Sequence, residues 1–135
     1  MSGLLLDTQV VITSIYHPGR LAPAVREALE DPGRDRVISV ITAFEMAVKT
    51  SLGKLPLPKA FARDFTAAFE ETVDRLSARS LDVRLSHAAR VRNLPFHHRD
   101  PFDRLLIAQA LEEGLTMVSS DRQFSAYDGL KVMPA

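Results

Sequence analysis

Short apolar segments alternate with longer helical patterns along this chain, and this alternation restricts its fold more than any other feature. Residues 3–7, 36–40, 80–85 and 115–119 have the pattern of buried strands, and residues 130–133 that of a short fifth strand. Helical patterns fill the intervals, most clearly at residues 58–76 and 101–113. Because strands that alternate with helices pair in parallel through crossovers, the sequence predicts an α/β fold. We expect a three-layer α/β/α sandwich around a mostly parallel sheet of four to five strands.

The length of 135 residues corresponds to one domain, and we expect residues 1–135 to form it. The chain contains no cysteine, which excludes a disulfide-stabilised secreted scaffold and a thiolate metal site. It also lacks an 18-residue apolar run and the pattern of a signal peptide, so we expect a cytoplasmic protein without a membrane segment. Because 17 acidic residues balance 17 basic ones, net charge does not indicate the partner.

Four carboxylates fall where the predicted strands end. Asp7 ends the first strand, and Asp121 follows the fourth strand by two residues. Glu45 is predicted in the first turn of the helix after the second strand, and Asp103 in the first turn of the helix over residues 101–113. Ligands of open α/β sheets bind at the carboxyl ends of the strands. We therefore expect these four side chains to meet at one edge of the sheet.

Carboxylates held close together repel each other, and a hard divalent cation relieves that repulsion. Mg²⁺ and Mn²⁺ prefer oxygen ligands and keep several water molecules. Such a cation activates water and stabilises the oxygens of a phosphoryl transfer, so the pattern favours a phosphodiester as substrate. Each acid also has a purely structural interpretation. Asp7 suits a helix cap, Asp103 the dipole of a helix N-terminus, Asp121 a turn and Glu45 a solvated helix face.

Four segments, in order along the chain, resemble the motifs of PIN-domain nucleases. They are LLLDT at 4–8, ISVITAFEMAVK at 38–49 with LGKL at 52–55, HHRDPFDRLLIAQA at 97–110, and GLTMVSSDRQF at 114–124. The third is the most specific. The chain is most similar to the VapC type, the toxin component of type II toxin–antitoxin systems. This sequence has Gln9 where similar chains often have His, and Phe44 where many have Trp.

The resemblance implies an endoribonuclease that depends on Mg²⁺ or Mn²⁺ and hydrolyses RNA. It implies a VapB-type antitoxin as partner, whose C-terminal segment covers the active site, and a toxin homodimer within a larger toxin–antitoxin complex. By position, Asp7 would be the central metal ligand, Glu45 and Asp103 would complete an acidic triad, and Asp121 would act on the metal through water. Ser119 would orient Asp7 or a water molecule on the metal.

Several neighbouring residues have open roles. Thr8 is predicted to cap the first helix. Arg104 either binds a phosphate or holds Asp100 or Asp103 in place. His97 and His98 either contact RNA and carry a proton or, as we favour, pack and cap a loop. Arg99 and Arg122 flank the same edge and are candidates for phosphate contacts.

Three other functions compete with a nuclease. A phosphatase of the haloacid dehalogenase type needs a second Asp at the position of Gln9. A phospho-acceptor receiver domain needs its Asp on a central strand and a late Lys, and neither is evident. A non-catalytic binding module that acts only in an antitoxin complex is the third, although four intact acids count against it. The sequence identifies neither the RNA that would be cut nor the number of metal ions.

Overall fold

The computed structural model, which describes residues 2–135, contains a five-stranded parallel sheet in the order β3-β2-β1-β4-β5. The strands are β1 (Leu4–Leu6), β2 (Arg36–Ser39), β3 (Arg79–Leu81), β4 (Thr116–Ser119) and β5 (Val132–Pro134). Every strand pair in the sheet is parallel, and β1 lies between β2 and β4 at the centre. The predicted α/β architecture is therefore confirmed, with all five strands in one sheet.

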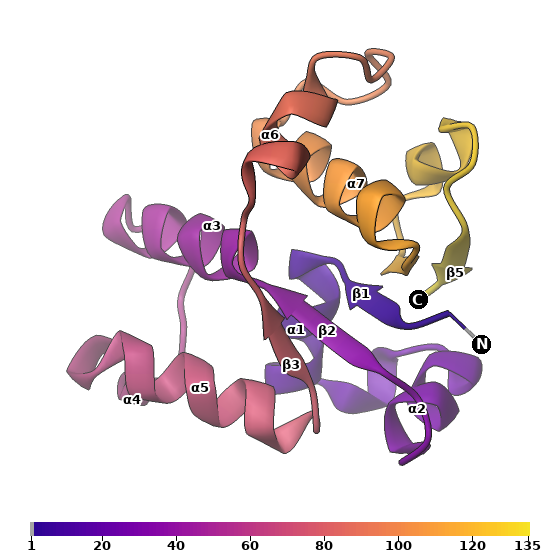
Figure 1. Cartoon of the computed structure of the whole chain (residues 1–135). Helices are drawn as coiled ribbons and strands as arrows, with labels where there is room; N and C mark the ends of the chain where they lie inside the picture. The colour runs from indigo at the N-terminus through magenta and orange to yellow at the C-terminus, as the bar shows by residue number, and fades with distance from the viewer. Residues whose placement is uncertain (1) are drawn as a thin grey trace.

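Helices cover both faces of this sheet (Figure 1). On one side lie α1 (Thr8–Tyr16), α2 (Pro23–Glu30), α4 (Lys59–Arg63) and α5 (Phe65–Arg75), and on the other lie α6 (Leu85–Val91) and α7 (Pro101–Glu113). The remaining elements are α3 (Val40–Ser51) and the 3₁₀ turns η1 (Pro18–Arg20) and η2 (Arg122–Ala126). None of the helices within residues 2–135 is both long and apolar enough to cross a membrane.

The core consists of two apolar clusters, one on each face of the sheet. Successive residues of a strand point to opposite faces, and β1 shows this directly. Leu4 and Leu6 pack in the cluster with α1, α2 and α5, whereas Leu5 packs in the cluster with α7 and η2. All three leucines are fully buried. Burial on both faces explains why the strand is a continuous apolar run.

The predicted helix over residues 58–76 is interrupted, which corrects the sequence interpretation. Asp64 has an extended backbone (φ −156°, ψ 95°) and its Oδ1 accepts a 3.1 Å hydrogen bond from the Ala67 N–H. Asp favours such a cap over a helix interior. The apolar stripe nevertheless continues across the break, because the ring of Phe65 packs on those of Phe61 and Phe69. One periodic pattern thus spans two helices.

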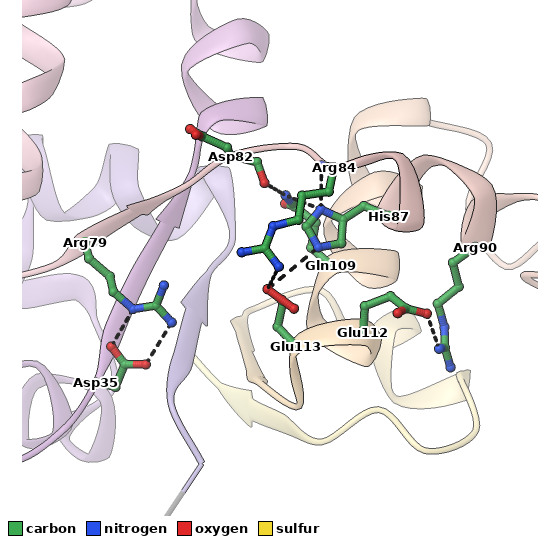
Figure 2. A network of polar contacts seen from close by, with 9 residues as sticks. All are labelled: Asp35, Arg79, Asp82, Arg84, His87, Arg90, Gln109, Glu112 and Glu113. Atoms are coloured by element: carbon green, nitrogen blue, oxygen red, sulfur yellow. Dashed lines mark hydrogen bonds and ion pairs between the residues drawn. The ribbon is translucent and has the colours of Figure 1, made fainter.

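The predicted strand over residues 80–85 is also too long, because α6 begins at Leu85. The buried imidazole of His87 accepts a 3.0 Å hydrogen bond from the Arg84 N–H and so caps the start of this helix. Figure 2 shows His87 beside Gln109 and Glu113 of α7. The Arg84–Glu113 and Arg90–Glu112 ion pairs also join α6 to α7. Directly after Glu113, at this same end of α7, the chain turns at Gly114 (φ 64°).

Candidate active site

A cavity of about 270 Å³ at the carboxyl edge of the sheet brings together the four predicted acids. Asp7 follows β1, Glu45 lies on α3, Asp103 on α7 and Asp121 after β4. Further lining residues are Thr8, Gln9, Lys49, Asp100 and Ser120. The strand order explains this meeting, since β1 and β4 are neighbours and their carboxyl ends lie side by side. Segments more than a hundred residues apart therefore share one cavity.

Asp7 is buried at the bottom of the site and held by β4. The Ser119 hydroxyl donates a 2.7 Å hydrogen bond to Asp7 Oδ2 and accepts one of 3.0 Å from the Asp121 N–H. Burial raises the pKa of Asp7, and the carboxylates of Glu45 and Asp121 raise it further, against the opposing effect of the Ser119 hydrogen bond. The predicted orienting role of Ser119 toward Asp7 has a direct geometric basis.

Glu45 lies in the second turn of α3, not the first, because that helix begins at Val40. Its Oε2 accepts a 2.5 Å hydrogen bond from the ammonium of Lys49, one helical turn later. Its Oε1 is buried and has no hydrogen-bond partner within residues 2–135. The hydrogen bond with Glu45 raises the pKa of Lys49. Burial of the ammonium lowers this pKa in part, and the negative charges of Glu45, Asp100 and Asp103 raise it further. The cavity thus contains the Lys49 ammonium and one carboxylate oxygen, Glu45 Oε1, that lacks a hydrogen-bond partner among the described residues.

Asp103 carries the largest pKa change in the site. Burial, followed by the charges of Asp100 and Asp7, raises the pKa of Asp103 to about 7. Asp100 itself caps α7, since its Oδ1 accepts a 2.8 Å hydrogen bond from the Phe102 N–H. Asp100 therefore has a structural role as the cap of α7, although its side chain also lines the cavity. Asp103 is a carboxyl group whose charge is poorly stabilised in the absence of a cation.

Asp121, in contrast, is held as a carboxylate. Its Oδ1 accepts a 2.9 Å hydrogen bond from the Gln123 N–H, and its Oδ2 lies 2.9 Å from Nε2 of His98. Burial opposes ionisation, but these two hydrogen bonds outweigh it and hold the pKa of Asp121 below its usual value. Asp121 and Asp103 therefore have pKa values displaced in opposite directions within one cavity, a pattern typical of acid–base sites.

The residues of this cavity fit a hard divalent cation. Carboxylate oxygens are the ligands that Mg²⁺ and Mn²⁺ prefer. The unpartnered Glu45 Oε1 and the raised pKa of Asp103 both show negative groups that a cation would stabilise. Ligand atoms of His98, Asp103 and Asp121 also lie within 4.8 Å of one another. The arrangement can therefore accept a cation between side chains from separate segments.

Two of the predicted supporting residues have other roles. Asp7, not Thr8, occupies the N-cap of α1, and the buried Thr8 Oγ1 lies 3.0 Å from Thr42 Oγ1. The buried guanidinium of Arg104 donates to backbone carbonyl oxygens and contacts neither Asp100 nor Asp103 in the described hydrogen bonds. Its acceptors are the carbonyls of Val91, Leu94, Pro95 and His98. Arg104 therefore fixes the loop before α7. The side chains of Arg99 and Arg122 are exposed.

Sequence reasoning missed three contributions to the site. Lys49 is four residues after Glu45, a spacing that places the two on one helix face and that offered a usable signal. The packing role favoured for the loop histidines is confirmed for His98, which stacks on Phe124, but its contact with Asp121 was not predicted. Tyr127, whose hydroxyl lies 3.0 Å from His98 Nδ1, had no signal in the sequence.

A larger cavity of about 740 Å³ lies between α6, α7 and the segment around Tyr127. It is lined by Arg90, His97 and Glu112, among others, and contains none of the four acids. Volume alone does not identify a catalytic site, whereas convergent acids with displaced pKa values do. We therefore place the candidate active site in the smaller cavity.

Comparisons with known proteins agree with this architecture. The chain is similar to three solved structures: DNA-bound VapBC from Salmonella typhimurium, VapBC2 from Rickettsia felis bound to a promoter DNA fragment, and FitAcB from Neisseria gonorrhoeae. Sequence identities are 22%, 17% and 25%, and TM-scores are 0.69, 0.72 and 0.62. The alignments cover 99%, 97% and 96% of this chain and 98%, 97% and 96% of the others.

A search of curated proteins finds no match. The family described as PIN domain matches residues 4–130, nearly the whole chain. This chain belongs to the PIN domain family, as its four motifs predicted.

Proposed function

We propose that this chain is a toxin that hydrolyses RNA phosphodiester bonds with Mg²⁺ or Mn²⁺ as a cofactor, as the catalytic half of a toxin–antitoxin pair. The observation that carries the proposal is the convergence of Asp7, Glu45, Asp103 and Asp121 on one cavity. Membership of the PIN domain family supports nuclease chemistry. The similarity to VapBC and FitAcB structures supports the toxin role.

The proposed metal ligands are Asp7, Glu45 and Asp103, with Asp121 beside them. A divalent cation bound there would supply positive charge to the phosphoryl oxygens and lower the pKa of a water molecule. Asp7 is oriented for this role by Ser119. The Asp121 carboxylate is held beside these ligands by its hydrogen bonds with Gln123 and His98, and it would act on the metal through a water molecule.

Lys49 has a place in the same chemistry. In the structure its ammonium pairs with Glu45, so it balances part of the negative charge of the cavity. The Lys49 ammonium would be available to contact a substrate phosphate if a bound cation balanced the charge of Glu45, since the Lys49 side chain is partly exposed at the cavity. This role would help to bring an anionic substrate to an acidic site.

An apolar groove apart from the acidic cavity supports an antitoxin as partner. It has a volume of about 180 Å³ and lies between the end of α3 and helices α4 and α5, where Leu55, Leu57, Phe61 and Phe65 line it. Leu52 is also 61% exposed at the end of α3. Apolar side chains on an antitoxin segment would cover this groove. That contact would join toxin and antitoxin in one complex.

An exposed apolar patch supports a toxin homodimer. Val40 and Phe44 follow β2, while Val83 and Leu85 follow the neighbouring β3, and all four side chains are at least 41% exposed. Because Ser39 pairs with Leu81, the two segments leave the sheet at the same edge. Burying this patch against its copy in a second subunit would remove four large apolar side chains from water. If light scattering gives the mass of a dimer for the wild type and of a monomer for Leu85→Glu, the result would support this dimer.

The test is cleavage of total cellular RNA by the purified chain without antitoxin. Reactions contain Mg²⁺, Mn²⁺ or chelator, and the variants are Asp103→Asn and, as a matched control, Glu70→Gln on the exposed face of α5. We expect discrete fragments that require metal, persist in the control and disappear in Asp103→Asn. Metal-independent fragments, or full cleavage by Asp103→Asn, would contradict the assignment. A chain that neither binds Mn²⁺ nor cleaves RNA would favour the non-catalytic binding module.

A further inference from the structure

Both carboxylate oxygens of Asp121 are fixed by different segments of the chain. Gln123, in the turn η2, donates its backbone N–H to Oδ1, and His98, in the loop before α7, faces Oδ2 at 2.9 Å. The first contact is local and typical of a turn, whereas the second joins residues 23 apart. A capping role for Asp121 explains the first contact but not the second. The second therefore needs its own explanation.

The ring of His98 is held in a single orientation. It is 6% exposed, stacks on Phe124 with a centroid distance of 4.6 Å and lies near-parallel to Tyr127 at 5.6 Å. Its Nδ1 is 3.0 Å from the Tyr127 hydroxyl. The other ring nitrogen, Nε2, faces a carboxylate oxygen, which accepts a hydrogen bond and has none to donate, so Nδ1 is left to accept from the Tyr127 hydroxyl.

This assignment fixes the other ring nitrogen. When Nδ1 accepts from Tyr127, the proton of the neutral imidazole lies on Nε2, which then donates to Asp121 Oδ2. The Asp121 carboxylate and the Tyr127 hydroxyl thus favour the same tautomer, which supplies a donor to the acid. In metal sites, hydrogen bonds from residues beyond the ligands orient the ligating side chains in this same way.

The loop that carries His98 is itself anchored beside the site. Arg104, adjacent to Asp103 on α7, donates to the carbonyl oxygens of Pro95 and His98 at 2.9 and 3.4 Å. It also donates to Val91 and Leu94, both at 3.2 Å, and its guanidinium lies 4.2 Å from the centre of the Phe96 ring. The position of His98 is therefore set by α7, the same helix that presents Asp103 to the cavity.

We infer that His98 is a positioning residue of the proposed nuclease site, whose Nε2–H holds the Asp121 carboxylate toward the cavity while Tyr127 helps to fix its tautomer. This inference rests on the proposed function, since it assigns Asp121 a role beside the metal. The geometry also presents a rival role. His98, Asp103 and Asp121 are close enough for His98 to bind a cation directly through Nε2, and then it would not donate to Asp121.

The test combines three substitutions with measurements on the Mn²⁺-loaded chain. His98→Met removes the donor while keeping bulk, and His98→Gln restores an N–H near the position of Nε2. Tyr127→Phe removes the hydroxyl that helps to fix the tautomer, and the exposed neighbour gives the matched control His97→Met. Circular dichroism and melting establish that each variant folds. If His98→Met does not fold, Tyr127→Phe serves as the test variant.

We expect His98→Met to weaken Mn²⁺ binding or lower kcat by about 10- to 100-fold with KM nearly unchanged. His98→Gln recovers most of this loss, Tyr127→Phe gives a smaller loss in the same direction, and His97→Met resembles the wild type. We expect electron spin echo spectra of bound Mn²⁺ to show no coupling to a coordinated imidazole nitrogen. Such a coupling, lost in His98→Met, would overturn positioning in favour of direct ligation.

Unchanged Mn²⁺ affinity and kcat in His98→Met would also overturn the inference and leave His98 a packing residue. The metal measurements keep this result separate from failure of the proposed function. If no RNA is cleaved by any variant, the nuclease proposal fails, while Mn²⁺ affinity and the nitrogen coupling still report on His98. If RNA is cleaved equally by all variants, only the role of His98 fails.

Discussion

The hydroxyl of Ser119 on β4 donates a 2.7 Å hydrogen bond to Oδ2 of Asp7, the residue that follows β1. The same hydroxyl accepts the Asp121 N–H, so one buried oxygen links two of the four acids. Replacement by Ala leaves the Asp7 carboxylate without this donor and the Asp121 N–H without this acceptor.

We therefore expect Ser119→Ala to lower the free energy of unfolding by about 1–3 kcal/mol, the cost of buried polar groups that lose their partners. Ser119→Thr keeps the hydroxyl and is the matched control. Urea denaturation of the metal-free variants at pH 7 measures the difference. An Ala variant as stable as the Thr variant would show that this hydrogen bond does not contribute to stability.

Asp103→Asn is expected to stabilise the metal-free protein at alkaline pH. The pKa of Asp103 is about 7 in the folded chain and about 3.9 in an unfolded one, so the folded state binds this proton more tightly. The resulting stability is fully present below the unfolded pKa and is lost as pH rises through 7. Because the side chain is partly exposed, we expect Asn to add only about 1–2 kcal/mol at pH 8.

Urea denaturation in chelator at pH 5 and pH 8 tests the sign. The gain from Asp103→Asn is expected at pH 8 and to be smaller at pH 5, and the exposed-site variant Glu70→Gln is expected to show no such pH dependence. An Asp103→Asn variant that is less stable than the wild type at pH 8 would contradict this electrostatic account of the site.

Mn²⁺ is expected to raise the melting temperature of the wild type. A ligand that binds only the folded state at a hundred times its Kd adds about 2.7 kcal/mol, which for a domain of this size corresponds to about 10 °C. Chelator reverses the shift. In Asp103→Asn most of the shift is lost, although the metal-free variant starts from a higher stability at pH 8. Equal shifts in both proteins would place the cation elsewhere.

Lys49→Gln is expected to separate metal binding from substrate binding. Removal of the ammonium frees Glu45, so the affinity for Mn²⁺ rises by about two- to fivefold, in line with a partly exposed ion pair. RNA cleavage falls through kcat/KM if Lys49 contacts a phosphate. Titration calorimetry and initial rates measure the two effects, and Lys54→Gln, on an exposed side chain, is the control. Weaker Mn²⁺ binding would contradict the competition between the ammonium and the metal.

Arg104→Lys is expected to act on stability more than on substrate affinity. A single ammonium cannot reproduce the planar fork that reaches four carbonyl oxygens, so we expect a loss of about 2–4 kcal/mol. The exposed Arg26→Lys, on α2, is the matched control. A raised KM for RNA with unchanged urea denaturation would instead favour the phosphate-binding role considered from the sequence.

Asp7 and Asp121 could be predicted from the sequence because short apolar runs marked the strands before them, and Glu45 and Asp103 from their positions in helical patterns. The edge of a parallel sheet then determined which side chains would share a cavity. Arg104 was harder, but helix geometry carried a signal. Neighbouring residues on a helix point about 100° apart, so Arg104 does not face the cavity that Asp103 lines. The contact between His98 and Asp121 had no such signal, because it depends on the path of a loop without periodicity.

The break at Asp64 illustrates a different limit. The apolar spacing through Phe61, Phe65 and Phe69 is helical in both interpretations, and it predicts the packed face correctly. Periodicity does not distinguish one helix from two that keep the same face. That choice depended on a single side chain capping its own backbone, an energy of about 1 kcal/mol.

The central position of β1 has a consequence for when the site comes into existence. Asp7 is among the first residues synthesised, but the oxygen that orients it belongs to Ser119, 112 residues later, on a strand that pairs directly with β1. Chains are made from the N-terminus at about 5–20 residues per second, and pairing between such distant segments is slow to form. A growing chain on the ribosome therefore contains Asp7, Glu45 and Asp103 before it contains a complete cavity. We expect the proposed nuclease activity to appear only after Asp121 has been made and β4 has joined the sheet.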